Sequence, residues 1–233
     1  MIVRNLVPAG RMHGYMEAIE QAFAAREANA GPEQSAHAPL EPVNGHNLAF
    51  DRAFVSGLTI LMVDAPHFLA SWMDQIEDCG ALDAVSGYLG ERPALSANKA
   101  TLYRLPNNPG SQWHQDGAFL GEGIRTVNLW VACTECGVDA PGLDLIPWRL
   151  DEIVQTGTHG SQFSWSVGDR FAEELARGRP IATPHFKPGD AILFDQLCLH
   201  RTAVRPGMTR GRFAIETWMF APSHYRGGVP LII

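Results

Sequence analysis

Two residues with metal-binding side chains stand two positions apart in the stretch Gln112-Trp113-His114-Gln115-Asp116-Gly117. Residues i and i+2 of an extended strand project from the same face, so the His114 imidazole and the Asp116 carboxylate could bind one metal ion. The pair alone is weak evidence, because a chain with 9 histidines contains roughly half a His-x-Asp by chance. Its meaning depends on what the rest of the chain adds.

His200 is the natural third ligand. It follows Asp116 by 84 residues (200 − 116), at the end of the predicted strand Ala191–Phe194. A jelly roll brings together strands that are far apart in sequence, so this separation is compatible with one shared site. Two histidines and one carboxylate on one side of an ion leave its other positions open, which is the arrangement of non-haem Fe(II) oxygenases.

A candidate partner for an anion follows the last histidine. Arg212 opens the apolar strand Arg212–Ala221, and a buried guanidinium is costly unless it binds an anion such as a carboxylate. Arg210 is the alternative. We prefer Arg212, because Arg210 lies in the preceding turn.

The composition is that of an ordinary globular enzyme and argues against two classes of partner. The 233 residues are 45% hydrophobic, and 25 acidic against 18 basic residues give a net charge of -7. Such a chain lacks a basic stripe, so we expect no nucleic-acid partner. With no apolar run of membrane-spanning length and no signal-peptide pattern at Met1–Asn5, we expect no membrane association and a cytoplasmic location. Cys133 and Cys136 form a lone CxxC, which we interpret as reduced thiols.

The first 95 residues are predicted to be largely helical. Apolar residues recur at helical spacing from Met12 to Ala28, from Asp64 to about Gly80 and from Leu82 to Leu89. The apolar segment Phe54–Val63 fits either a strand or the start of a helix. Residues 29–47 are rich in Ala, Gly and Pro and are predicted to form a surface loop, with a lid as the alternative.

After Pro93 the pattern changes to short strands separated by turn residues. One helix, at Gly168–Arg177, interrupts them, and Asp169 could cap it. The fold is therefore predicted to be mainly β, a sandwich or barrel over residues 96–225 with a helical flank over 1–95, in one domain spanning 1–233. The expected strands are Lys99–Leu105, Trp113–Asp116, Ile124–Cys133, Leu143–Ile146, Ala191–Asp195 and Arg212–Ala221.

Five pieces of this region occur in a recognisable order: residues 113–117 (WHQDG), 128–132 (NLWVA), 141–147 (PGLDLIP), 187–194 (KPGDAILF), and His200 with Thr202 and Arg212. Together they resemble the phytanoyl-CoA dioxygenase (PhyH-like) family of Fe(II)- and 2-oxoglutarate-dependent oxygenases. The resemblance covers residues 98–221, about half of the chain. It implies a double-stranded β-helix core of the jelly-roll or cupin type.

The resemblance also implies residue roles. Iron would be bound by His114, Asp116 and His200. Arg212 would pair with the distal carboxylate of 2-oxoglutarate, assisted by the Thr202 hydroxyl, and Trp130 would line the 2-oxoglutarate pocket. With O2, the enzyme would hydroxylate a small organic molecule and release succinate and CO2. Where the family usually continues Pro147 with Gly-Ser-His, this chain has Trp148-Arg149, so we expect a different loop near the substrate.

Other chemistries remain open from the sequence. Halogenating relatives carry a small residue where this chain has Asp116, which favours hydroxylation over halogenation, while desaturation could follow from the same centre. Two rival classes are a cupin-like Zn(II) hydrolase or isomerase and a non-catalytic jelly-roll binding protein. Four further side chains could touch substrate, although core or strand-edge packing is our preferred interpretation of each: Tyr103, Lys99, Gln112 and Phe119.

Overall fold

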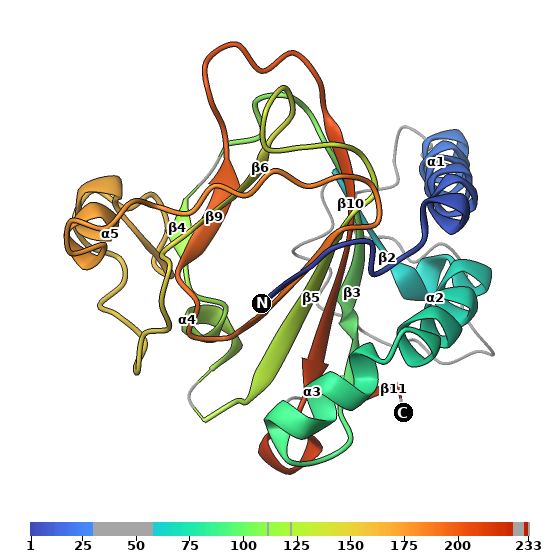
Figure 1. Ribbon diagram of the computed structural model, residues 1–233, viewed down its shortest axis with the longest axis horizontal. Helices are drawn as coiled ribbons and strands as arrows, with labels where there is room; N and C mark the ends of the chain where they lie inside the picture. The colour runs from blue at the N-terminus through green and yellow to red at the C-terminus, as the bar shows by residue number, and fades with distance from the viewer. Residues whose placement is uncertain (30–57, 111, 122, 226–230, 233) are drawn as a thin grey trace.

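Two antiparallel β-sheets face each other across the middle of the computed structural model (Figure 1). The described residues are 1–29, 58–110, 112–121, 123–225 and 231–232. Within them the larger sheet has the order β1-β8-β5-β10-β3-β11, with β2 also paired to β3, and the smaller has the order β6-β9-β4-β7. The fold is a double-stranded β-helix with flanking helices that come mostly from the N-terminal part, as predicted.

The bounds of the elements are as follows. The larger sheet contains β1 (Ile2–Val3), β2 (Thr59–Leu61), β3 (Ala94–Leu105), β5 (Thr126–Ala132), β8 (Ala191–Asp195), β10 (Arg212–Phe220) and β11 (Leu231–Ile232). The smaller sheet contains β4 (Trp113–His114), β6 (Gly142–Leu145), β7 (Ser166–Val167) and β9 (His200–Ala203). The α-helices are α1 (Ala9–Asn29), α2 (Pro66–Asp78), α3 (Ala81–Leu89), α4 (Gly117–Leu120) and α5 (Asp169–Leu175), and short 3-10 turns lie at Met62–Asp64 and Pro222–His224.

The outer face of the larger sheet is covered by the N-terminal helices (Figure 1). Alternate residues of β10 form this face: Ile215 and Met219 are buried in the main core, and Phe213 packs against it. Thr217, on the same face, accepts a hydrogen bond of 2.9 Å from Trp72 Nε1 of α2. Burying each large apolar side chain contributes about 1.5–3 kcal/mol, so this layer fixes the sheet that forms the floor of the site.

The smaller sheet is covered on its outer side by α5 (Figure 1). Trp113 of β4 and Val167 of β7 pack there with Ala172 of the helix in a separate cluster. The two sheets thus have separate outer cores. Their inner faces meet in a third buried cluster, which joins Trp130 of β5 and Phe194 of β8 to Leu143 of β6.

Two local expectations are wrong. The N-cap of α5 is Gly168, which has no side chain to cap the helix, and Asp169 is the first helical residue, whose carboxylate accepts a hydrogen bond of 2.7 Å from Arg201. His200 does not end the strand Ala191–Phe194: β8 lies in the larger sheet, and His200 opens β9 in the smaller one. The proposed lid at 29–47 lies, apart from Asn29, outside the described residues, and of Phe54–Val63 only 58–63 is described, with β2 and the 3-10 turn at Met62–Asp64.

Candidate active site

Strand pairing brings the two candidate histidines together. His114 of β4 and His200 of β9 are direct partners in the antiparallel ladder, and their ring centroids lie 4.4 Å apart. Directly opposed residues on one face of such a pair have Cβ atoms about 4.5–5.5 Å apart. The register of the smaller sheet is therefore what joins two residues separated by 86 positions (200 − 114).

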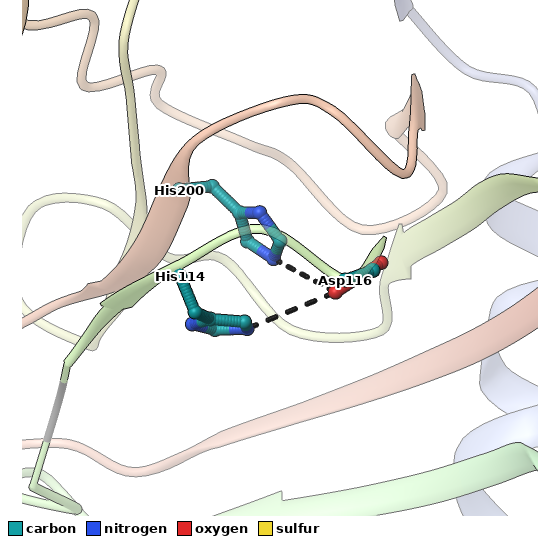
Figure 2. A group of neighbouring side chains, drawn as sticks. All are labelled: His114, Asp116 and His200. Atoms are coloured by element: carbon teal, nitrogen blue, oxygen red, sulfur yellow. Dashed lines mark ion pairs between the residues drawn. The ribbon is translucent and has the colours of Figure 1, made fainter. Parts of the chain in front are cut away.

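The backbone conformation that brings Asp116 to the two histidines differs from the one that the sequence predicted. β4 ends at His114, and Asp116 has right-handed helical dihedral angles (φ −57°, ψ −35°) as the residue before α4. The expectation that both side chains share one face of a continuous strand is thus wrong in its geometry, although the two groups do converge (Figure 2). Glycine at Gly117 lets the turn pack closely, because an added Cβ would lie 2.5 Å from Ile153 Cδ1 and 3.1 Å from the Gln196 carbonyl oxygen, so that both neighbours would have to shift.

The residue between the two ligands fastens this turn to the rest of the site. Gln115 is buried, and its Nε2 donates to the carbonyl oxygens of Leu197 (2.8 Å) and Glu152 (3.0 Å). Its Oε1 accepts from the Val154 amide at 2.8 Å. Because Leu197 lies in the loop that leads to His200, one amide side chain ties both histidine-bearing segments together.

The hydrogen bonds of the two imidazoles select the same tautomer in each. His114 Nδ1 lies 2.9 Å from the carbonyl oxygen of Gln112, and His200 Nδ1 lies 3.0 Å from that of Cys198. A carbonyl oxygen can only accept, so each Nδ1 carries the proton and each Nε2 is left with a lone pair. Both Nε2 atoms face Asp116 Oδ1, at 3.8 Å for His114 and 3.7 Å for His200 (Figure 2).

Burial sets the charges of these groups. It lowers the pKa of His114 to about 4, with a further lowering from His200 that Asp116 partly offsets, and it lowers the pKa of His200 to about 4 as well. Both imidazoles are therefore neutral at pH 7, which is the form that binds a metal. Burial also raises the pKa of Asp116, against the opposing effects of His114 and the Asn128 hydrogen bond.

The three residues fit a metal ion. Their ligand atoms all lie within 4.8 Å of one another. Asp116 Oδ1 is buried without a hydrogen-bond partner among the described residues, and its distances to the two Nε2 atoms are too long for hydrogen bonds. A buried carboxylate oxygen left in this way is costly, and a cation between it and two neutral imidazoles would satisfy it.

A cavity of about 220 Å³ opens onto these three residues between the two sheets. One end is formed by Arg212 with its neighbours Thr202 and Trp130, the residues for which the family resemblance implies 2-oxoglutarate binding. The other end is aromatic and is formed by Phe119, Trp165 and Trp218.

Arg212 is a buried cation at the first of these ends. It is 3% exposed, and burial lowers its pKa. Its NH1 donates to the carbonyl oxygens of Pro141 (2.9 Å) and Gly142, and its NH2 lies 3.5 Å from the Thr202 hydroxyl. The guanidinium carbon stands 5.1 Å from the centre of the Trp130 ring. Nε has no hydrogen-bond partner, and no carboxylate lies within ion-pair distance, among the described residues.

Arg210, the alternative to Arg212, points elsewhere. Its side chain is 54% exposed and lies 3.5 Å from the Asp139 carboxylate, and it does not line the cavity. This arrangement favours Arg212 over Arg210 as the anion partner.

The four flanking side chains divide between cavity and periphery. Tyr103 and Phe119 line the cavity. Lys99 places its ammonium 4.7 Å from the Trp218 ring and 5.5 Å from the Phe119 ring, at the aromatic end but outside the lining. Gln112 Oε1 accepts from the Gln162 amide and so supports a neighbouring loop.

The loop after Pro147 does not border this cavity. Trp148 and Arg149 line a separate space of about 430 Å³ beside α3, and Arg149 forms an ion pair with Asp195. The unusual sequence at this position therefore changes a neighbouring surface and not the wall of the 220 Å³ cavity.

Sequence reasoning missed Glu216, Trp218 and Trp165 as cavity residues. The first two could have been found, because they lie four and six residues after Arg212 on the same face of β10. Trp165 could not, because it lies in a segment that carries no periodic pattern.

The family of the chain follows from a sequence comparison. The model of the family described as phytanoyl-CoA dioxygenase (PhyH) matches residues 1–204. The chain belongs to the phytanoyl-CoA dioxygenase (PhyH) family. It is an enzyme, an Fe(II)- and 2-oxoglutarate-dependent oxygenase that also uses O2. The match includes His114, Asp116 and His200 and ends before Arg212. No curated protein sequence matches the chain.

Solved structures of low sequence identity share the fold of this PhyH-family chain. EctD from S. alaskensis, crystallised with 2-oxoglutarate and 5-hydroxyectoine, is 18% identical with a TM-score of 0.66, over 96% of this chain and 72% of that one. EvdO2 from Micromonospora carbonacea var. aurantiaca with 2-oxoglutarate is 16% identical, with a TM-score of 0.59 over 97% and 88%. The epimerase SnoN with Fe3+, alpha ketoglutarate and nogalamycin RO is 14% identical, with a TM-score of 0.59 over 94% and 78%.

Proposed function

We propose that this PhyH-family oxygenase hydroxylates a small organic molecule, with Fe(II) held by His114, Asp116 and His200. The observation that carries the proposal is that this three-residue face and the buried cation of Arg212 open onto one cavity. A zinc hydrolase or isomerase would need the face but not the cation. A binding protein without catalysis would need neither to be intact.

The cation end of the cavity suits the distal carboxylate of 2-oxoglutarate. Arg212 NH1 already donates hydrogen bonds to two carbonyl oxygens. Nε has no partner among the described residues, and NH2 makes only a long contact of 3.5 Å with the Thr202 hydroxyl. A carboxylate would supply the missing acceptor and the missing counter-charge together. Trp130 would support the guanidinium by the cation–π contact of 5.1 Å.

The aromatic end of the cavity suits the organic substrate. Phe119 packs against Trp165 and Trp218 with ring centroids 5.7 Å and 5.5 Å away, and His114 contacts both Phe119 and Trp165. Apolar carbon held there would lie beside the metal face. The relatives EctD and SnoN were crystallised with 5-hydroxyectoine and nogalamycin RO, which are small organic compounds and fit the same class of substrate.

The chain's own groups would bind, orient and exclude water around this chemistry. Iron with 2-oxoglutarate and O2 supplies the oxidising power that replaces a C–H bond by C–OH, and the products of the co-substrate are succinate and CO2. The neutral imidazoles and the Asp116 carboxylate would give the ion one negative ligand. Because Asp116 occupies the position that halogenating relatives leave open, hydroxylation is favoured over halogenation.

Two further expectations are part of the proposal. We place the enzyme in the cytoplasm, which the four free cysteines support because a reducing compartment preserves thiols and Fe(II) alike. We also treat residues 1–233 as one domain. Among the described residues, none of the helices is both long and apolar enough to cross a membrane.

Turnover of 2-oxoglutarate tests the proposal. Purified protein with Fe(II), 2-oxoglutarate, ascorbate and air should convert 2-oxoglutarate to succinate, faster when a metabolite panel contains the substrate, and His200→Ala should reduce the rate by about 100-fold or more. The matched control is His185→Ala, a half-exposed histidine that pairs with Glu135 outside the cavity. Turnover of a panel compound in the absence of O2, with no succinate formed, would instead support the hydrolase or isomerase class.

A further inference from the structure

The two oxygens of Asp116 have different surroundings. Oδ1 faces both histidine Nε2 atoms and has no hydrogen bond within the described residues, whereas Oδ2 accepts a hydrogen bond of 3.2 Å from Asn128 Nδ2. In Figure 2 both dashed contacts end on one oxygen, and the second oxygen points away from the histidines. Something must hold this carboxylate against rotation, because a free one could present both oxygens to an ion.

Asn128 is placed to do so. It lies on the inner face of β5, is fully buried, and its Nδ2 donates to Glu216 Oε1 at 2.8 Å as well as to Asp116 Oδ2. The amide thus uses its two N–H bonds on two carboxylates. Its own Oδ1 has no partner among the described residues, and exchanging the ends of the amide would press that oxygen against both carboxylates. The amide therefore has one acceptable orientation.

Glu216 is the second hydrogen-bond acceptor of the Asn128 amide and holds it on the side away from Asp116. It lies on β10 beside β5, and Tyr103 of β3 donates a hydrogen bond to it from the other side. A buried carboxylate is costly, and these two donors offset that cost. Glu216 does not touch the three-residue metal face, so its influence on that face passes through Asn128.

We propose that Asn128 and Glu216 are positioning residues that hold Asp116 as a ligand through Oδ1 alone. This inference rests on the proposed metal site and adds the reason why that site keeps positions open for 2-oxoglutarate and O2. A carboxylate that binds through one oxygen occupies one position of an ion, and outer hydrogen-bond partners of ligands commonly change metal affinity by about 10–100-fold. A purely structural role for the pair would stabilise the fold without changing metal binding.

Cobalt(II) is the probe, because it binds iron sites, is stable in air and has visible absorption that reports its coordination. Asn128→Ala should raise the Kd for Co(II) by about 10–100-fold and change the spectrum. Glu216→Ala should produce a smaller loss, because Asn128 keeps its bond to Asp116 but loses its anchor. Glu216→Gln retains an acceptor oxygen and should stay within about threefold of the wild type.

The double variant Asn128→Ala/Glu216→Ala distinguishes an effect of Glu216 that passes through Asn128 from a direct effect of its charge on the ion. If Glu216 acts through Asn128, then Glu216→Ala should not weaken Co(II) binding further when Asn128 is already alanine. If the negative charge of Glu216 acts directly on the ion, the loss should persist in that background, and Glu216→Gln should be as weak as Glu216→Ala. Either of these last two results would overturn the inference.

A matched control lies on the same strand. Thr217→Val removes a buried hydrogen bond, to Trp72, on the opposite face of β10. It should lower the melting temperature and leave the Kd and spectrum of Co(II) unchanged. Wild-type affinity and spectrum in Asn128→Ala would also overturn the inference. A wild type that binds no Co(II), or binds it equally well after His114→Ala, would instead contradict the proposed metal site itself.

Discussion

At the scale of single residues, two buried side chains of the cavity each lack, within the described part of the chain, a partner that a bound ligand would supply. Asp116 Oδ1 lacks a hydrogen-bond donor and Arg212 lacks an ion-pair partner among the described residues, and both lie on the wall of the same cavity. In a natural protein such gaps are costly, and they are expected where a ligand completes the site. The most specific predictions therefore concern these two positions.

The first prediction concerns Arg212. Arg212→Ala should weaken 2-oxoglutarate binding by about 30-fold or more, because removing one partner of a buried charge pair costs at least about 2 kcal/mol. Arg210→Ala is the control and should change the affinity by less than about twofold, since its exposed side chain pairs with Asp139. Anaerobic calorimetry of the Fe(II)-loaded protein measures both. A loss confined to Arg210→Ala would reverse the assignment.

The second prediction concerns the pH dependence set by the two histidines. Their pKa values are about 4 in the folded state against about 6.5 when unfolded, so the unfolded chain binds more protons between these values. Their contribution to the free energy of unfolding of the metal-free protein should therefore rise as the pH rises from about 4 to about 6.5. Urea unfolding of the wild type and of His114→Asn/His200→Asn, compared over this range, isolates it. If the free energy of unfolding had the same pH dependence in both proteins, the two imidazoles would not have lowered pKa values in the folded state.

Much of the site at this scale is predictable from the sequence, because His114, Asp116 and His200 have metal-binding side chains and stand in an order that resembles the PhyH-like family. The part that is not predictable is how they meet. Asp116 turns inward by a helical conformation, and the following Gly117 packs beside Ile153 and donates a hydrogen bond of 3.0 Å to the Gln196 carbonyl oxygen, which lie 36 (153 − 117) and 79 (196 − 117) residues away. Local sequence carries no signal for such a contact.

At the scale of elements, the position of β9 is the most consequential feature, because this strand carries His200 and Thr202. It is joined to β6 by a ladder and by Asp144. The Asp144 carboxylate is fully buried and accepts hydrogen bonds from Arg201 (3.0 Å), Arg205 (2.6 Å) and Thr183 (2.8 Å). Burial raises its pKa, but the three donors outweigh this and hold the pKa below its usual value.

The third prediction follows from this cluster. Asp144→Ala should lower the free energy of unfolding by about 3 kcal/mol, the lower end for breaking a buried charge pair, because Arg205 is 40% exposed and can be rehydrated. Asp139→Ala removes an exposed pair with Arg210 and should cost less than about 1 kcal/mol. Chemical denaturation compares the two. Equal losses would mean that Asp144 does not fasten β9.

Strands with a clear apolar pattern were predictable, and strands defined by their partners were not. β8 was predicted at its observed bounds, and β10 was predicted from its observed first residue, Arg212, to one residue beyond its observed end at Phe220. β7 has only the residues Ser166 and Val167, and it exists because β4 pairs with it. β3 begins at Ala94, five residues before the predicted Lys99, because β10 and β11 continue its ladder that far.

At the scale of the whole molecule, the two sheets enclose a cavity in which Asp116 Oδ1 and Arg212 Nε have no hydrogen-bond partner among the described residues. A metal cation would pair with Asp116, and an anionic co-substrate would pair with Arg212. The chain carries a net charge of -7, so we expect the binding of anionic 2-oxoglutarate to depend on the local cation of Arg212. Binding of the metal and the co-substrate should therefore be coupled to stability.

The fourth prediction is that ligands stabilise the molecule. Fe(II) or Mn(II) at about 100 times its Kd should add about 2.7 kcal/mol to the free energy of unfolding and raise Tm by about 5–10 °C, with a further rise on adding 2-oxoglutarate. A chelator should reverse the shift. Thermal scans of the wild type and of His114→Ala/Asp116→Ala provide the comparison, and an equal shift in both would show that the metal binds elsewhere.

The central claim is that one metal face binds Fe(II) and 2-oxoglutarate together. Its most direct test is the visible metal-to-ligand charge-transfer band that forms when 2-oxoglutarate chelates Fe(II), recorded without O2. The wild type should develop this band on addition of 2-oxoglutarate, and His114→Ala should not. Absence of the band in the wild type, or its persistence in His114→Ala, would contradict the assignment of this face.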